Sequence, residues 1–251
     1  MSLPIALQLY TVRDVVSKDP DAGLAQVAGL GYANVELAGD YGLAPEALRA
    51  LLDKHNLTAV AAHVGLNFFE SDMAGAIANA KVLGYENLIL PWVGKEWQTP
   101  EGYRKLAGLL SDAAKVAGDA GMTVGYHNHA FEFETLDDGS FGYEILTEEA
   151  DEAVAFEMDV YWVVRGGHDP HQWLNILAGR VPLLHMKDMA NTPEQGFAEV
   201  GTGTIDLAAV AGQAVKAQVE TLVIEQDSNW KDNDPMNSAR VGLANLTQML
   251  G

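Results

Sequence analysis

The sequence predicts an α/β protein in which a single (β/α)8 barrel takes up the whole chain, residues 1–251. Eight short apolar runs, rich in β-branched residues, each precede a longer segment whose Ala and Leu recur at helical spacing, which is the pattern of βα units. The runs start about 31 residues apart on average, which leaves room for one strand, one helix and two short connections. No linker and no shift of composition marks a domain boundary.

The eight strands are expected at the apolar runs. In chain order they begin at Ile5, Asn34, Thr58, Asn87, Thr123, Val154, Val181 and Thr221. Parallel strands in a barrel are buried on both faces and therefore read as short continuous apolar runs. A doubly wound open sheet is the alternative, but a nucleotide-binding sheet of that kind carries a Gly-rich turn after its first strand, and residues 9–13 read LYTVR.

Helices are expected between the strands, over residues 21–30, 44–55, 71–83, 100–120, 143–149, 170–178, 206–217 and 237–250. Two of them start on a capping residue followed by proline, at Thr99–Pro100 and Asp169–Pro170. Others end on a glycine before the next strand, as at Gly31, Gly84 and Gly121, where a positive φ lets the chain turn back.

The charge of the chain argues against anionic partners. It has 15 Lys and Arg against 35 Asp and Glu, a formal net charge of −20, so nucleic acid and anionic membrane surfaces are repelled. No apolar run approaches the roughly 20 residues of a membrane span, and the first residues lack the pattern of a signal peptide, so we expect a cytoplasmic protein. Because the chain has no cysteine, only His, Asp and Glu are available as metal ligands.

Polar side chains gather at the carboxyl ends of the expected strands, where barrel enzymes place their active sites. These residues are Glu36, His63, His127, Asn128, His129, Glu157, Asp159, His185, Lys187, Asp188, Glu225 and Asp227. Strand side chains alternate between the lumen and the helices, so residues two apart, such as His185 and Lys187, share a face. Imidazoles and carboxylates that meet at one mouth suit a divalent metal such as Mn, Mg, Co or Zn.

Each of these residues also has an ordinary structural interpretation. A strand-end histidine such as His63 can be a hydrogen-bonded structural residue, and Glu36 can pair with a neighbouring Lys or Arg. A site role is favoured for His185 because it ends an apolar run, where burial without a partner is costly. Asp188 is expected to be structural and to pair with Lys187 at the rim.

Five segments together resemble one known family. They are YHNHAFEF at 126–133, EMDVYW at 157–162, HMKD at 185–188, EVGTGTID at 199–206 and IEQD at 224–227. They resemble the sugar phosphate isomerase/epimerase family of the xylose isomerase-like TIM barrel superfamily, and the likeness runs from the first strand to the last helix. The motifs are specific for the superfamily and much less so for a substrate.

The resemblance implies one divalent metal, manganese for preference and Mg, Co or Zn as alternatives. Ketose 3-epimerases of this family hold it with residues from the ends of strands five to eight, and the matching positions here are His127, Asp159, His185 and Glu225. Strand five departs from the pattern, because the epimerases have Glu before Asn where this chain has His127 before Asn128. Epimerisation by two symmetric glutamates is therefore not expected.

The resemblance further implies an enzyme, an isomerase or epimerase that removes a proton next to the carbonyl of a sugar or keto-sugar and forms an enediolate. Glu225 or His129 is expected to act as the base, and Lys187 to polarise or protonate a substrate oxygen. Substrate contacts are expected from Glu36, His63, Glu132 and Trp162.

Three alternatives remain. The same enediolate can lose a β-substituent, which would make the protein a dehydratase or lyase acting on a keto-sugar, keto-glycoside or keto-inositol. A metal-free sugar-binding barrel would use the same polar residues for hydrogen bonds alone. The abasic-site endonuclease branch of the superfamily is disfavoured by the charge of −20 and by too few ligands for three metals. The expected partner is a small, neutral sugar; a homo-oligomer is compatible with the sequence.

Overall fold

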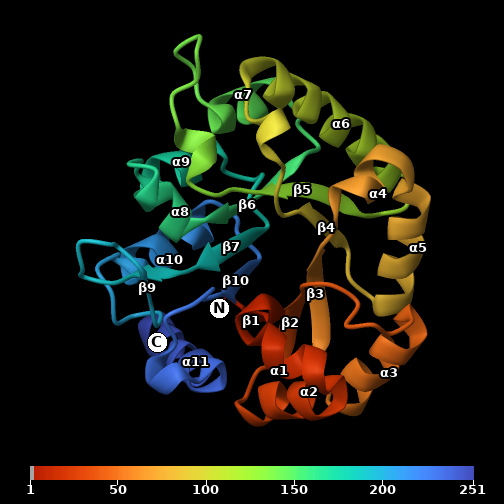
Figure 1. Cartoon of the computed structure of the whole chain (residues 1–251), viewed down its shortest axis with the longest axis vertical. Coiled ribbons are helices and arrows are strands. Elements are labelled where there is room, and N and C mark those ends of the chain that lie inside the picture. Colours follow the sequence, from red (N-terminus) through yellow and green to blue (C-terminus); the bar gives the residue numbers. More distant parts are fainter. Residues whose placement is uncertain (1–2) are drawn as a thin grey trace.

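A computed structural model describes residues 3–251 and shows a closed barrel of eight parallel strands (Figure 1). The order around the barrel is β1, β2, β3, β4, β5, β6, β7 and β10, and β10 pairs with β1 to close it. The strands span Ile5–Gln8, Asn34–Leu37, Thr58–His63, Asn87–Leu90, Thr123–His127, Ala155–Asp159, Leu183–Met186 and Thr221–Ile224. The predicted fold class is confirmed.

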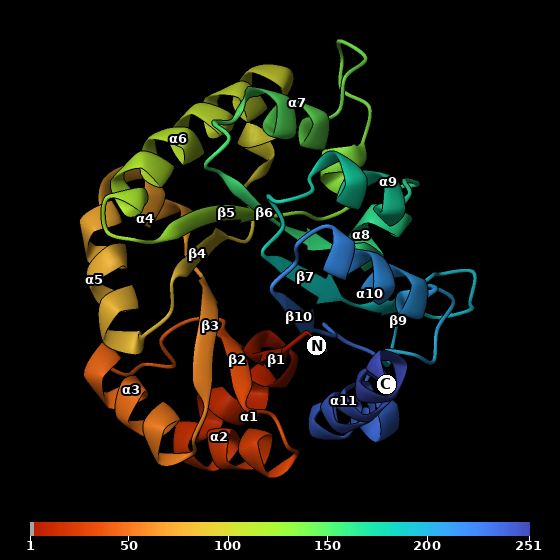
Figure 2. The ribbon, with the colours of Figure 1, turned by 180° about the vertical axis from the view of Figure 1, so that it is seen from behind.

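The helices lie outside the ring of strands, as both views show (Figures 1 and 2). α1 to α6 span Arg13–Lys18, Pro20–Gly29, Pro45–Lys54, Leu66–Ser71, Met73–Leu83 and Pro100–Gly118. α7 to α11 span Gly142–Glu149, Val160–Arg165, Pro170–Ile176, Leu207–Lys216 and Pro235–Leu250. Within residues 3–251, none of them is both long and apolar enough to cross a membrane.

The expected caps at two helix starts are present. The hydroxyl of Thr99 accepts a hydrogen bond from the backbone N–H of Gly102, and the carboxylate of Asp169 accepts one from His171. In both cases a backbone donor that the first helical turn leaves unpaired is satisfied by the cap.

Some short elements differ from the expectation. β6 and β7 begin at Ala155 and Leu183, one and two residues later than expected. The helix α8 follows β6 directly, and two residues separate α4 from β3. A small antiparallel pair, β8 (Asp188–Met189) and β9 (Phe197–Ala198), lies after β7. Two-residue strands carry no apolar periodicity of their own, so a pattern of spacing could not indicate them.

A small apolar layer fills the barrel below the strand ends. Its residues, which form a cluster separate from the main core, are Ala6, Ala61, Ile89, Leu183 and Val223. Gly125 makes room for it, because a Cβ at that position would lie 2.6 Å from Cδ1 of Ile89. Side chains two residues further along each strand share the lumen face, so the polar strand ends project into the lumen above this layer.

Candidate active site

A pocket of about 440 Å³ opens at the carboxyl ends of the strands. Six of the strand-end residues predicted from the sequence line it, namely His63, His127, His129, Lys187, Glu225 and Asp227. The structure thus brings together side chains from β3 and β5 and from the residues that follow β5, β7 and β10 in one cavity. Two aromatic residues at its rim, Tyr10 and Trp92, are 43% and 55% exposed.

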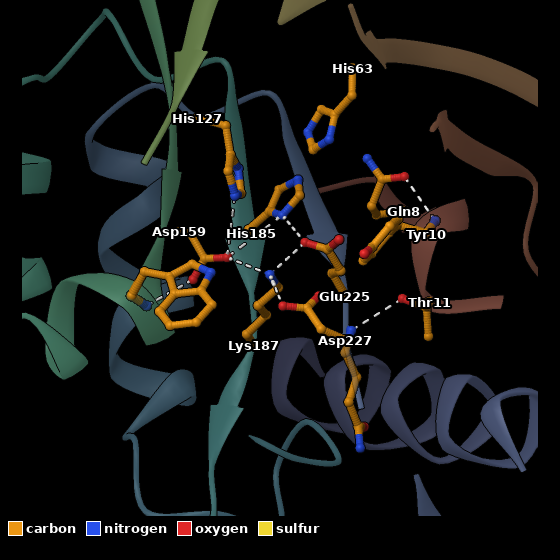
Figure 3. A network of polar contacts seen from close by, with 12 residues as sticks. Gln8, Tyr10, Thr11, His63, His127, Asp159, His185, Lys187, Glu225 and Asp227 are labelled. Carbon is orange, nitrogen blue, oxygen red and sulfur yellow. Dashed lines mark hydrogen bonds and ion pairs between the residues drawn. The ribbon is translucent and has the colours of Figure 1, made fainter. Parts of the chain in front are cut away.

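The four predicted metal ligands converge beside this pocket (Figure 3). One ligand atom each from His127, Asp159, His185 and Glu225 lies within 4.8 Å of all the others. Oδ2 of Asp159 is 3.9 Å from Nε2 of His127 and 3.8 Å from Nδ1 of His185. Nδ1 of His185 is in turn 2.9 Å from Oε2 of Glu225.

The donor set fits a divalent cation. Oδ2 of Asp159 is buried and has no hydrogen-bond partner within the described part of the chain, although the ammonium of Lys187 is 3.2 Å away. Lys187 offsets part of the charge of this carboxylate, and a divalent cation would pair the same oxygen with the two imidazoles that it faces at 3.8 and 3.9 Å. Two imidazoles and two carboxylates are suitable ligands for Mn, Co or Zn.

A second cluster lies deeper in the barrel, around Glu157. Its Oε2 is 2.8 Å from Nε2 of His63, 3.0 Å from Nδ1 of His127 and 3.1 Å from Nε2 of His185. Oε2 of Glu36 is 2.8 Å from the same nitrogen of His185. Glu36 and Glu157 are both fully buried, so Glu36 pairs with histidine and not, as was possible from the sequence, with a Lys or Arg.

Glu157 is the site residue that the sequence interpretation left without a role. It shares the lumen face with Asp159, two residues further along β6, and this parity was available as a signal. Gln8, at the end of β1, is a second such residue: it is fully buried and its Nε2 has no hydrogen-bond partner among residues 3–251.

Lys187 is surrounded by carboxylates. Its Nζ lies 2.7 Å from Glu225, 3.2 Å from Asp159 and 3.2 Å from Asp227. Burial opposes its charge, but the three carboxylates outweigh burial and hold the pKa of Lys187 well above its ordinary value. Lys187 is therefore protonated and can donate a hydrogen bond into the pocket.

Asp188 does not pair with Lys187, contrary to the expectation from the sequence. Its carboxylate accepts hydrogen bonds from the backbone N–H groups of Met189, Gly201, Gly203 and Ile205. The expected structural role is confirmed, because one buried carboxylate holds the 199–206 turn against the end of β7.

His129 faces the pocket as a neutral imidazole. Burial, together with the neighbouring His127, lowers the pKa of His129 well below its ordinary value. Its ring packs 5.3 Å from the ring of Trp162, whose indole also lies 5.6 Å from Nζ of Lys187. Trp162 thus packs against two residues that line the pocket, His129 and Lys187.

Glu132 lies apart from the pocket. It is fully buried, and its two oxygens accept hydrogen bonds from the hydroxyl of Tyr126 and the backbone N–H of His129, each at 2.7 Å. Tyr126 directly precedes His127 on β5 and points to the opposite, helix-facing side. The expectation that Glu132 binds substrate hydroxyls is not met, because the 3-10 turn Phe131–Phe133 carries the carboxylate under the loop.

Comparison with known proteins supports the fold. No curated protein matches the chain. A sugar phosphate isomerase/epimerase from Parabacteroides distasonis ATCC 8503 superposes with a TM-score of 0.85 at 22% identity, over 98% of this chain and 94% of that one. The IOLI protein with a binding zinc atom gives 0.75 at 14% identity, over 99% and 98% of the two chains.

A third similar structure is the probable 3-DHS dehydratase AsbF from Bacillus anthracis, with a TM-score of 0.74 at 12% identity over 98% of this chain and 99% of that one. These likenesses concern the fold. The model of one family, described as the xylose isomerase-like TIM barrel, matches residues 24–248 of the sequence. The chain therefore belongs to the xylose isomerase-like TIM barrel family.

Proposed function

We propose that the protein is an enzyme, a divalent-metal-dependent isomerase or epimerase of a neutral sugar or keto-sugar, with the whole chain 1–251 acting as one domain. The observation that carries the proposal is the convergence of His127, Asp159, His185 and Glu225 beside a pocket large enough for a monosaccharide. The family match and the isomerase/epimerase among the similar structures support it.

The four-residue cluster would hold the metal, with manganese as our first choice and zinc as the alternative that the zinc-bound IOLI protein supports. A bound divalent ion supplies positive charge that stabilises an oxyanion next to the reacting carbon. The chain's own residues supply the rest. Lys187 donates a hydrogen bond to a substrate oxygen, because it is protonated and its ammonium lines the pocket.

Proton transfer falls to Glu225 or to His129, which both line the pocket. Neutral His129 can accept a proton from a carbon next to the carbonyl, and the product of that step is an enediolate. Return of the proton to the other face of the same carbon gives an epimer. Return to the neighbouring carbon gives an isomer.

A dehydratase or lyase is the second candidate, and the asymmetry of the site favours it. Where two matched bases would face the substrate in a symmetric epimerase, this pocket has imidazoles on the β5 side and the Glu225–Lys187–Asp227 group on the other. One side can remove the proton while the ammonium protonates a leaving hydroxyl. The probable dehydratase among the similar structures supports this alternative.

The test is exchange of solvent deuterium into the substrate. Protein loaded with Mn²⁺ is incubated with ketoses, keto-sugars and keto-inositols in heavy water, and deuterium at the carbon next to the carbonyl is followed by NMR and mass spectrometry. Epimerisation and isomerisation pass through the enediolate and leave deuterium next to the carbonyl of the product. A lyase passes through the same enediolate and predicts deuterium in recovered substrate, where the enediolate is reprotonated before the substituent departs. Sugar binding without exchange and without stoichiometric metal would show instead a binding barrel.

A further inference from the structure

The two clusters of candidate ligands share the imidazoles of His127 and His185. Nδ1 of His127 faces Glu157 at 3.0 Å, while its Nε2 faces Asp159 at 3.9 Å. For His185 the arrangement is similar, with Nε2 3.1 Å from Glu157 and Nδ1 2.9 Å from Glu225. Each ring therefore presents one nitrogen to the deep cluster and the other to the cluster beside the pocket.

A neutral imidazole carries one proton and one lone pair, so the two clusters cannot both use these rings as metal ligands in that form. If the ion is held beside the pocket, the ring protons lie on the nitrogens that face Glu157. If the ion is held at Glu157, the protons face Asp159 and Glu225. The position of the ion therefore determines the tautomers of His127 and His185.

For His127 the distances favour a proton at Glu157. Nδ1 of His127 is hydrogen-bonded to Oε2 of Glu157 at 3.0 Å, while Nε2 of His185 is hydrogen-bonded to Oε2 of Glu36 at 2.8 Å and lies 3.1 Å from Oε2 of Glu157. On the other side, the 3.8 and 3.9 Å separations from Asp159 are too long for hydrogen bonds. Nδ1 of His185 is 2.9 Å from Oε2 of Glu225, so an ion held beside the pocket would take the place of a proton between these two atoms.

Access points the same way. His127 and Glu225 line the pocket, whereas Glu36 and Glu157 are fully buried beneath the histidines. An ion beside the pocket can be reached by a substrate oxygen, and the carboxylates beneath it are placed as the outer partners of its imidazole ligands. Carboxylates in this position fix the tautomer and orientation of metal-bound histidines in proteins.

We propose that Glu157 is a positioning residue whose oxygen Oε2 accepts the ring proton of His127 and shares that of His185 with Glu36, and so turns Nε2 of His127 and Nδ1 of His185 toward one metal ion. The deep cluster around Glu157 then holds protons and no second ion. The inference rests on the proposed metal dependence and extends it. Glu157 would orient both imidazole ligands with one carboxylate, while Glu36 would orient His185 alone.

The experiment measures metal binding and not turnover. Full-length wild type, Glu157→Gln, Glu157→Asp and Glu36→Gln are stripped with a chelator and titrated with Co²⁺ against a competing chelator, with bound metal counted by mass spectrometry. Glu152→Gln, an exposed change three residues before β6, is the matched control. Circular dichroism and thermal melts verify that each variant is folded.

We expect one ion per chain in the wild type. Glu157→Gln should bind it about 10- to 100-fold more weakly, with Glu157→Asp in between, Glu36→Gln affected less and Glu152→Gln unchanged. Proton NMR of the Co²⁺ protein should show two exchangeable, hyperfine-shifted ring N–H signals that Glu157→Gln shifts and exposes to faster exchange. The wild-type spectrum shows whether the two ring N–H signals are present, and so tests the inference even if the Glu157 variants fail to fold.

Two ions per wild-type chain, unchanged affinity in a folded Glu157→Gln, or absence of the two N–H signals would each overturn the inference and leave metal-dependent chemistry standing. A wild type that binds no ion would overturn both this inference and the proposed function. One ion with the expected losses, but no deuterium exchange on any substrate, would sustain the role of Glu157 and contradict the proposed reaction.

Discussion

The ammonium of Lys187 lies 2.7 Å from Oε2 of Glu225, the oxygen that is also 2.9 Å from Nδ1 of His185. A metal ion would share this carboxylate with a fixed positive charge. Lys187→Met keeps much of the buried chain and removes the charge, so we expect divalent metal to bind several-fold more tightly and kcat to fall by about 10²-fold or more. Chelator competition and steady-state kinetics measure both; equal losses of affinity and turnover would contradict separate roles.

Removal of a direct ligand should abolish stoichiometric metal. We expect wild-type protein to hold about one ion per chain, and His185→Ala or Glu225→Ala to hold none after dialysis, because each change takes one ligand from a set of four. Elemental analysis after gel filtration gives the count. Glu152→Ala, at an exposed position, is the control, and metal retained by both ligand variants would refute the assignment.

The substrate should be a neutral sugar and not its phosphate ester. Lys187 is the cation in the pocket lining, within the described residues, and three carboxylates already surround it. Trp162→Ala should lower kcat/KM on the best neutral substrate about tenfold, because the indole supports Lys187 and His129. Faster reaction of the phosphorylated analogue, with Trp162→Ala unimpaired, would show both expectations to be wrong.

Glu132 should make stability depend on pH. Burial raises the pKa of Glu132 to about 8 from an ordinary value of 4.5, so its contribution is greatest below pH 4.5 and is lost as pH rises to 8. Between these limits the wild type should lose up to about 1.4 kcal/mol of unfolding free energy per pH unit relative to Glu132→Gln. Urea titrations from pH 5 to 8 compare the two, and parallel curves would contradict the shift.

The turn at 199–206 should depend on one carboxylate. Asp188→Ala removes the buried acceptor of four backbone N–H groups, and we expect it to lower the free energy of unfolding by about 3–5 kcal/mol. Asp206→Ala, which removes only the cap on Ala209 at the start of α10, should cost about 1 kcal/mol. Urea denaturation measures both; equal effects would mean that the turn does not depend on Asp188.

The barrel could be predicted because its main elements carry local signals. Six strands begin where their apolar runs begin, as at Ile5 and Thr221, and Pro at the first helical turn indicates helices such as Pro100–Gly118. The short helix Val160–Arg165 and the pair β8–β9 follow from tertiary contacts instead. The first is capped by Asp159, a member of the candidate ligand cluster, and the second is anchored by Asp188.

Residue type and strand parity predicted that the site lies at the carboxyl ends of the strands, but they did not predict which side chains contact each other there. His185 was identifiable because a histidine that ends an apolar run needs a buried partner, but which partner it has depends on the barrel's closure. Glu36 comes to it from β2, 149 positions away. Glu132 was expected to contact substrate, yet the turn at Phe131–Phe133 directs its carboxylate to Tyr126.

Closure of the ring by β1 and β10 has a consequence for how the protein is made. During synthesis, Glu36 and the histidines emerge from the ribosome long before Thr221–Ile224, the strand that brings Glu225 beside His185. A nascent chain without that strand has an open sheet and an incomplete ligand set. Such long-range pairing is a slow step of folding, so the ability to capture a metal ion should appear abruptly, in the same kinetic phase as the last strand's insertion.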